Sequence, residues 1–446
     1  MGANHFPRGK KLTYLPVKMK PTFNLSTDFA RQLDENDILS DFRQQFYFAD
    51  ENTIYLDGNS LGRLPLKTRD LITDVVEKQW GKDLIESWNK NWYTKSEELG
   101  NKIAKIIGAS KGEVIVSDST SVNLYKLAKA ALKFQEGRTQ IVSDIFNFPT
   151  DLYILQGIIQ EFGTDYELIL ARSKDEISID LDDLKDKITE RTALVVLSLV
   201  AFKSAFLYDA KEITNWAHQK GALVIWDLSH AAGAVPVEMN KTNADLAVGC
   251  TYKYLNGGPG SPAFLYVRKD LKEKLSSPIQ GWFGEENPFE FGISYRPAPG
   301  IKKFLTSTPP VINLMAIEPG LDLLMAAGIS NLYEKSVPQT EFFIHLTMEI
   351  LAKHGFEIGS PLDPLKRGSH VSLKHPEAYR ICQSLIQPKN GNIKIIPDFR
   401  EPNNIRFGFT PLYTTFTEIW QTVERIQIIL QTKEYEQFSN ERKSVT

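Results

Sequence analysis

Cysteine is scarce in this sequence: its 446 residues include two, Cys250 and Cys382. Two cysteines cannot build a disulfide framework, so the composition favours a reducing compartment and excludes a cysteine-rich zinc module. The seven histidines are scattered and form no HExxH motif or tight cluster with carboxylates. We therefore expect no metal site, because protein metal sites need such ligands close together.

An excess of one charge and a long hydrophobic run are also missing. The chain carries 52 Lys+Arg and 55 Asp+Glu, a net charge of −3, and so lacks the basic footprint of a nucleic-acid-binding protein. The longest strongly apolar run, residues 193–202, is about half the length of a membrane-spanning helix. Basic residues precede the first acid, Asp28, without the apolar block of a secretory signal. We expect a cytoplasmic protein with no nucleic-acid or membrane partner and a mobile N-terminal arm over residues 1–40.

The middle of the chain alternates short apolar runs with helical patterns. The pattern predicts strands over 114–117, 140–142, 193–199 and 223–226, and helices over 121–134, 150–162 and 211–220. Such alternation is typical of an α/β fold with a mostly parallel sheet covered by helices on both sides. In such sheets, ligands bind beyond the carboxyl ends of the strands.

The last quarter of the chain has a different pattern. After a long helix predicted over 311–327 come strand-like runs at 371–373, 393–396 and 405–409, and helical patterns at 376–386 and 417–431. We expect a large α/β domain over 41–330, whose N-terminal part contributes to the small domain or to an interface. A smaller α+β domain is expected over 331–446.

The most informative segment for function runs from Trp226 to Gly260. A strand ends in Asp227, and Lys253 follows 26 residues later, just before a glycine-rich turn. This pair suits pyridoxal phosphate, because a lysine amine forms a Schiff base with the aldehyde and then moves protons, while a carboxylate keeps the pyridine nitrogen protonated. The alternative, a helix-capping Asp and a surface Lys, is weakened by the glycines, which permit close backbone approach.

Two strand-to-helix turns offer further contacts to such a cofactor. Residues 117–121, Ser-Asp-Ser-Thr-Ser, supply hydroxyl and backbone N–H groups for a phosphate, although a plain helix N-cap explains them equally well. In the turn around Pro149, Phe148 is placed to stack on the pyridine ring. A hydrophobic staple at the start of the helix is the alternative for Phe148.

Longer motifs resemble one enzyme family, the kynureninases. The likeness runs from about Phe42 to the C-terminus and is carried by residues 56–62 (LDGNSLG), 148–151 (FPTD), 251–256 (TYKYLN), 281–284 (GWFG) and 406–413 (RFGFTPLY). It implies a PLP enzyme of fold type I, a homodimer whose active site lies at the subunit interface. Kynureninases hydrolyse L-kynurenine to anthranilate and L-alanine, and some prefer 3-hydroxykynurenine.

The resemblance also implies roles for individual residues. Lys253 would attach the cofactor and Asp227 would pair with its ring nitrogen. The phosphate would be held by Thr120, Ser121 and Tyr252, with Trp282 and Thr308 supplied by the partner subunit. Phe148 would stack on the ring, whose edge would be lined by Asp151, Ser198 and His230. Arg406 would clamp the substrate α-carboxylate, Asn59, Ser60 and Trp88 would line the substrate pocket, and Tyr252 would donate or relay a proton.

The chain departs from the family pattern at three positions. Glu285 stands where the family commonly has His, Ala201 where it has Asn or His, and Pro397 where it tends to have Gly. The first two are expected near the substrate, so they bear on substrate identity and rate. Two alternatives to kynureninase therefore stay open: a related PLP enzyme for another β-acyl or β-substituted amino acid, and an inactive binding protein that keeps the fold.

Overall fold

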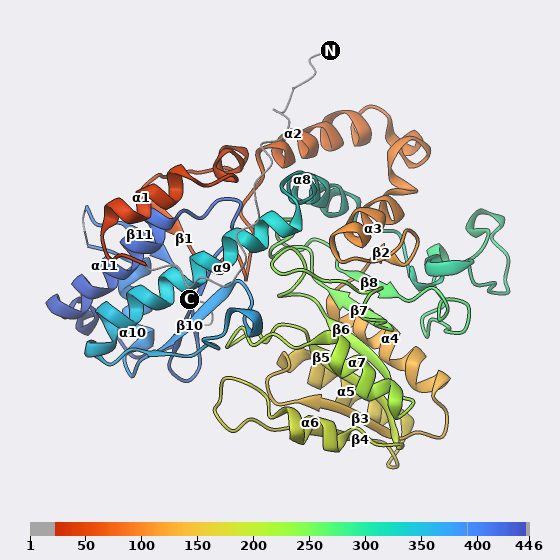
Figure 1. Cartoon of the computed structure of the whole chain (residues 1–446). Coiled ribbons are helices and arrows are strands. Elements are labelled where there is room, and N and C mark those ends of the chain that lie inside the picture. The colour runs from red at the N-terminus through yellow and green to blue at the C-terminus, as the bar shows by residue number, and fades with distance from the viewer. Residues whose placement is uncertain (1–22, 390, 443–446) are drawn as a thin grey trace.

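The computed structural model describes residues 23–389 and 391–442, and its centre is a seven-stranded sheet (Figure 1). The strand order is β2-β8-β7-β6-β5-β3-β4; β8 runs antiparallel to both neighbours, and the other neighbouring strands are parallel. The strands are β2 (Val114–Val116), β3 (Gln140–Asp144), β4 (Glu167–Ala171), β5 (Thr192–Ser198), β6 (Leu223–Asp227), β7 (Leu246–Gly249) and β8 (Phe264–Val267).

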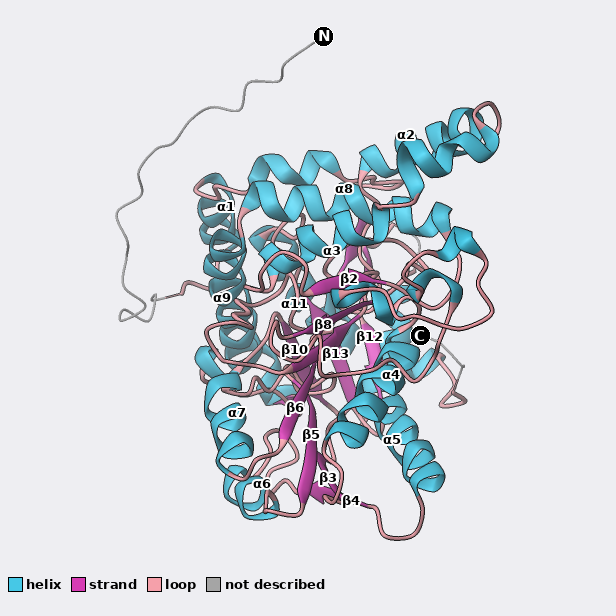
Figure 2. Ribbon diagram, turned by 90° about the vertical axis from the view of Figure 1, so that its right-hand side faces the viewer, coloured by secondary structure: helices cyan, strands magenta, loops and turns pink. Residues whose placement is uncertain are grey.

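Helices cover both faces of this sheet because its central strands are apolar on both sides. Successive side chains of a strand point to opposite faces, and Ile225 and Trp226 accordingly lie in two separate hydrophobic clusters. The helices of this domain are α2 (Leu66–Asp74), α3 (Lys95–Ile106), α4 (Thr120–Phe134), α5 (Pro149–Phe162), α6 (Leu181–Lys187), α7 (Ala210–Gln219) and α8 (Val311–Ala327) (Figure 2).

A smaller α+β unit packs beside the large sheet (Figure 1). Its strands form a four-stranded antiparallel sheet, β12-β13-β10-β9, and a parallel pair, β1-β11. These are β1 (Thr53–Tyr55), β9 (Glu357–Ile358), β10 (His370–Lys374), β11 (Lys394–Ile396), β12 (Asp398–Arg400) and β13 (Asn404–Gly408). Its helices are α1 (Thr27–Glu35), α9 (Ile329–Leu346), α10 (Ala378–Ile386) and α11 (Phe416–Thr432).

The predicted elements of the large domain are confirmed to within a few residues, but the N-terminal expectation needs correction. Residues 1–22 of the expected arm lie outside the described residues. Within 23–40, α1 packs against α11 and buries Ala30 in the hydrophobic core of the small unit. The prediction of a mobile arm was therefore wrong for residues 23–40, because the apolar residues of α1 pack against the hydrophobic core of the small unit. The pairing of β1 with β11 likewise places N-terminal residues in the small unit.

Several elements were not predicted: strands β1, β4, β7, β8, β9 and β12 and helices α1, α2, α3, α6 and α9. The strand β8 runs against its neighbours, so the βαβ pattern that identified the others does not extend to it. Among the described residues, no single helix is long and apolar enough to cross a membrane, although the sharply bent pair 311–327 and 329–354 passes the same test on length and composition.

Candidate active site

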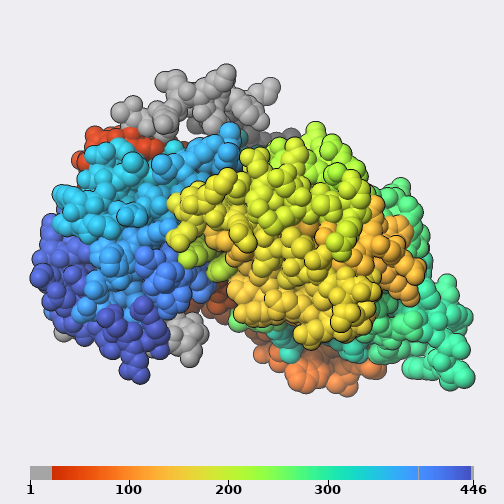
Figure 3. Space-filling model, turned by 90° about the horizontal axis from the view of Figure 1, so that it is seen from below, coloured from red at the N-terminus to blue at the C-terminus, as the bar shows by residue number. Residues whose placement is uncertain are grey.

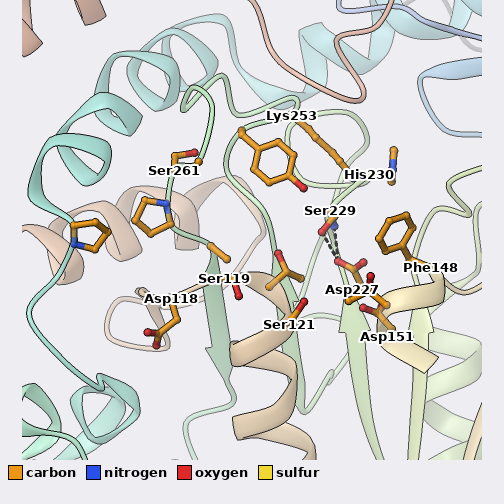
Figure 4. A pocket seen from close by; sticks show the side chains of 17 residues that line it. Asp118, Ser119, Ser121, Phe148, Asp151, Asp227, Ser229, His230, Lys253 and Ser261 are labelled. Atoms are coloured by element: carbon orange, nitrogen blue, oxygen red, sulfur yellow. Dashed lines mark hydrogen bonds between the residues drawn. The ribbon is translucent and has the colours of Figure 1, made fainter. Parts of the chain in front are cut away.

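A pocket of about 490 Å³ opens beyond the carboxyl ends of β2, β3, β6 and β7 (Figure 4). Loops that follow these strands, the first turns of α4 and α5, and the segment before α8 form its wall. Eight of the residues singled out in the sequence line it: Thr120, Ser121, Phe148, Asp151, Asp227, His230, Tyr252 and Lys253. The segments that carry them are far apart in the chain and meet here because parallel strands end at one edge of a sheet.

Lys253 lies in the turn after β7, held close to other backbone. A side chain at Gly62 would collide with the Lys253 carbonyl, because a Cβ at this glycine would lie 2.4 Å from that oxygen. The Lys253 amine lies 3.0 Å from Nε2 of His230 and 5.8 Å from the centre of the Phe148 ring. Burial, followed by the nearby Lys253 charge, holds the pKa of His230 well below its usual value. His230 is therefore a neutral imidazole beside the amine.

Two carboxyl groups face one another on the floor of the pocket (Figure 4). Asp227, the last residue of β6, accepts hydrogen bonds from the backbone N–H (2.8 Å) and hydroxyl (2.6 Å) of Ser229. Burial raises the pKa of Asp227. Asp151 is buried, one of its oxygens has no partner among the described residues, and burial and the Asp227 charge raise its pKa well above the usual value. Two buried carboxyl groups this close are unfavourable when they have no positive partner. A cationic N–H group bound beside them would stabilise their charged form.

The opposite end of the pocket is the start of helix α4. Ser119 is the N-cap, and its hydroxyl accepts from the Val122 N–H at 3.3 Å, so the plain capping interpretation holds for this serine. Thr120 and Ser121, the first two residues of α4, line the pocket. The first N–H groups of a helix have no intrahelical partner and favour anions, so this end suits a phosphate.

A buried lysine that the sequence reasoning missed holds this turn. Lys126 is fully buried on α4, and its amine donates to the Asp118 carboxylate at 2.7 Å and to the Phe304 carbonyl at 2.6 Å. Asp118 has a left-handed backbone (φ 48°) and also accepts from the Thr306 hydroxyl at 2.7 Å. The available signal was an acid just before the predicted helix, Asp118, and a lysine 8 residues later within it.

The pocket therefore matches pyridoxal phosphate at three points: an amine for the aldehyde, buried carboxyl groups for the ring nitrogen, and a helix start for the phosphate. Phe148 completes the match at the ring face. It precedes α5, with Pro149 as the first helical residue, and its ring lies edge to face with Phe202 at 5.4 Å. No described contact identifies Phe148 as a hydrophobic staple.

Arg406 lies in the small unit and is not among the residues that line this pocket. It is 1% exposed on β13, and its guanidinium contacts the Asp398 carboxylate, the Ser60 hydroxyl and the Phe202 carbonyl. With its oxygen turned toward the guanidinium, the Asn59 amide accepts from Nε at 2.7 Å. Asn59, Ser60 and Arg406, predicted separately, are thus brought together in one cluster.

The comparisons with known proteins agree with this geometry. The chain is 44% identical to the kynureninase of Pseudomonas fluorescens over 91% of its own length and 95% of that protein, and 41% identical to the kynureninase of Burkholderia pseudomallei over the same shares. The chain belongs to the kynureninase family. Residues 332–426 also match the family described as the kynureninase C-terminal domain.

Solved structures confirm the predicted fold class. A cysteine desulfurase from Thermococcus onnurineus matches with a TM-score of 0.75 at 19% identity, covering 88% of this chain and 98% of that one. A C-DES variant described with glycine covalently linked to its PLP cofactor matches with a TM-score of 0.74 at 17% identity, covering 86% and 98%. The α/β fold with its mostly parallel sheet is thus that of these enzymes.

The remaining residues assigned to the cofactor edge lie close to Asp227. Ser198 ends β5 in register with Asp227, and its hydroxyl donates to the Asn147 side-chain oxygen at 2.7 Å. The sequence reasoning missed His370, a fully buried residue of β10 whose ring lies 5.5 Å from that of His230. Burial and the charges of Arg406 and Lys253 lower its pKa well below the usual value. His370 therefore places a side chain of the small unit next to His230, a residue that lines the pocket.

Trp88, Trp282 and Thr308 do not reach the pocket of their own chain. The Phe283 ring lies 5.7 Å from Trp88 and 4.9 Å from Trp282, so the two tryptophans share one aromatic cluster. Trp282 is partly exposed, its indole N–H donates to the Pro288 carbonyl, and Thr308 is exposed. Within one chain Trp88 packs against Trp92 and Phe283, away from this pocket, and its place in the substrate pocket stays a prediction.

The three departures from the family pattern have different surroundings. Glu285 accepts from the Asn287 N–H and pairs with Arg296 at 3.2 Å, so it holds the base of a protruding hairpin over residues 285–297. Ala201 is buried and forms only backbone hydrogen bonds, with Phe206 and Ala205. Pro397 separates β11 from β12, and β12 begins at Asp398.

Proposed function

We propose that this protein is a PLP-dependent kynureninase that hydrolyses L-kynurenine to anthranilate and L-alanine. The observation that carries the proposal is the meeting of Lys253 and the buried Asp227 in one pocket, in a chain of this family. When bound, pyridoxal phosphate supplies an aldehyde for attachment and a ring that accepts electrons from the substrate α-carbon. Every other task falls to side chains of the protein.

Lys253 is the base that removes and returns protons at the substrate carbons. Neutral His230, 3.0 Å from the amine, accepts a hydrogen bond and keeps the amine aimed into the pocket. Asp227 keeps the ring nitrogen protonated, because a carboxylate fixed by Ser229 stabilises a cationic N–H. Burial raises the pKa of Tyr252, so its hydroxyl stays protonated and suits a proton donor. Arg406 with Ser60 binds the α-carboxylate.

The test is product analysis with L-kynurenine, 3-hydroxykynurenine and cysteine sulfinate in the presence of pyridoxal phosphate. We expect anthranilate and alanine from L-kynurenine, and a yellow protein whose label is fixed at Lys253 by borohydride. Lys253→Ala should lose both turnover and borohydride fixation. Turnover of cysteine sulfinate alone would favour the related-enzyme alternative, and binding of cofactor without turnover of any of the three would favour the inactive binding protein.

We further propose a cytoplasmic homodimer with a shared active site. Support comes from Trp282 and Trp88, which lie outside the pocket of their own chain, and from the hairpin 285–297, which projects from the body (Figure 1). Phe289, Phe291 and Ile293 on this hairpin are exposed. A second copy would cover these apolar side chains, since contiguous exposed apolar surface is unfavourable in water.

Subunit complementation tests the shared site. Lys253→Ala and Trp282→Ala chains are each expected to be inactive or strongly impaired alone. If Trp282 acts in the partner's pocket, unfolding and refolding the two together creates mixed dimers in which one site has both residues. Recovered activity would therefore support the proposal. A mixture that stays as inactive as its components, although mixed dimers are isolated by two affinity tags, would contradict it.

A further inference from the structure

The Arg406 guanidinium is held by a buried carboxylate that the proposed reaction does not use. Nε of Arg406 donates to one oxygen of Asp398 at 2.9 Å, and Nη2 donates to the other oxygen. Asp398 is 2% exposed and Arg406 is 1% exposed. The contact is therefore a two-point, fork-to-fork pair within the small unit, the geometry that fixes a guanidinium most tightly.

The other edge of the same guanidinium is less occupied. Nη2 also donates to the Ser60 hydroxyl at 2.8 Å, and Nη1, which carries two hydrogens, makes one described hydrogen bond, to the Phe202 carbonyl. The Nη1–Nη2 edge thus presents one uncommitted N–H beside the Ser60 hydroxyl, which donates to Asp398 at 3.1 Å and would turn from it toward a new acceptor. A substrate carboxylate needs two such donors side by side.

The charges around Arg406 favour the binding of one more anion. Arg400 lies 2.6 Å from Asp398, so two guanidinium groups share this single carboxylate. A second carboxyl, Asp57, also faces the cluster, and burial with the Asp398 charge raises its pKa to about 7. When Asp57 is protonated, the cluster carries a net charge of +1, which an incoming carboxylate neutralises.

We propose that Asp398 is a positioning residue: it fixes the Nε–Nη2 edge of Arg406 so that the Nη1–Nη2 edge receives the substrate α-carboxylate. The inference rests on the proposed function of Arg406 as the carboxylate clamp. Phe202 connects the Asp398–Arg406 pair to the pocket, because its carbonyl accepts a hydrogen bond from Arg406 while its ring packs against Phe148. In this proposal Asp398 touches neither substrate nor cofactor; it acts through Arg406 and through the Ser60 hydroxyl, which donates to it at 3.1 Å.

Asp398→Asn tests the assignment with little change in side-chain size. An amide offers one acceptor and turns an NH₂ group toward the Arg406 donors, so the two-point contact is lost. We expect KM for L-kynurenine to rise by roughly 10-fold or more, since a misplaced clamp loses binding steeply, while kcat changes less. Inhibition by L-alanine should weaken by the same factor, and inhibition by L-alaninamide, which lacks the carboxylate, should stay as in the wild type.

Glu434→Gln is the matched control. It breaks another buried pair of the small unit, with Arg425 at 2.6 Å, away from the residues that line the pocket. This variant should lower stability without changing KM. Asp398→Glu, which retains the carboxylate, should recover part of the lost affinity for L-alanine.

Three results would overturn the inference. Tighter binding of L-alanine by Asp398→Asn would mean that Asp398 competes with substrate, and an equal loss for alanine and alaninamide would mean a purely structural role. Unchanged constants would mean no role. Failure of the proposed function is distinguishable, because a wild-type protein that binds alanine but does not cleave L-kynurenine fails before any variant is compared.

Discussion

The two halves of the candidate site are built differently. The residues for the cofactor converge at one edge of one sheet, and the pocket they line lies within the large domain of a single chain. The residues expected to meet the substrate are split between a buried cluster in the small unit, around Arg406, and an aromatic cluster beside a projecting hairpin. Within one chain the pocket is thus built by the large domain, whereas the residues for the substrate are divided between the large domain and the small unit, which lie side by side in the space-filling view (Figure 3).

The largest expected effect concerns the cofactor half. Asp227→Asn replaces the charge that keeps the ring nitrogen protonated and should lower kcat about 100- to 1000-fold, the loss typical of one electrostatic partner of the transition state. Steady-state turnover of L-kynurenine measures it. Asp245→Asn is the control, since Asp245 is as buried but pairs with Arg268 and His218. An equal kcat loss in both variants would show that general damage, not ring electronics, is the cause.

Lys126→Met tests whether the phosphate end depends on its buried lysine. The substitution leaves the Asp118 carboxylate and the Phe304 carbonyl without their amine and should lower the free energy of unfolding by about 3 kcal/mol. Affinity for pyridoxal phosphate should fall as well, because the turn before α4 loosens. Urea denaturation and cofactor titration measure the two effects.

Lys129→Met is the companion variant on the same helix. Lys129 pairs with Glu161 at the surface, where such a pair contributes less than about 1 kcal/mol. Similar losses of stability in the two variants would rule out a special role for the buried pair.

Substrate binding should depend on pH through the ionisation of Asp57. Its pKa, raised to about 7 by burial and by Asp398, lies above the ordinary carboxyl value. Asp57 is therefore protonated below about pH 7 and becomes a carboxylate above it, opposing a substrate carboxylate near Arg406, Arg400 and Ser60. KM should rise with pH above 7, approaching 10-fold for each unit. Asp57→Asn should flatten this rise, and a wild-type KM that is constant from pH 6 to 8.5 would contradict it.

The cofactor half could be predicted from the sequence because its signals are local. Asp227 ends an apolar strand, Lys253 precedes a glycine-rich turn, and both must lie at the same sheet edge if the strands are parallel. The family motifs then assigned the remaining roles. Lys126 was missed because its role depends on a contact with Phe304, 178 residues away, which no periodicity reports.

The substrate half could be predicted only as a set of residues, not as an arrangement. The motif that contains Arg406 gave the arginine but not its pairing with Asp398, which follows from the antiparallel register of β12 and β13. The aromatic cluster around Trp88 likewise follows from its packing against Phe283, a residue of a distant segment. Both contacts depend on strand pairing and tertiary packing, so a sequence pattern with a short period does not contain them.

The smallest expected effect asks whether the ion pair across the two units contributes to substrate binding. Glu176, on a loop of the large domain, lies 3.5 Å from Lys374 of β10, and its side chain is largely exposed. Its backbone is left-handed (φ 61°), a conformation that costs a non-glycine residue about 1 kcal/mol. Glycine removes this strain but raises the entropy of the unfolded chain by a similar amount, so Glu176→Gly should change the free energy of unfolding by less than about 1 kcal/mol and leave KM unchanged.

Glu176→Gln separates the charge from the backbone in this experiment. It removes the ion pair but keeps the left-handed residue, so its stability should match the wild type within about 0.5 kcal/mol. Thermal or urea unfolding and a KM measurement complete the comparison. If KM rose in both variants, the exposed pair would be part of what brings the small unit to the pocket, and the buried contact between Arg406 and Phe202 would not be sufficient for that task.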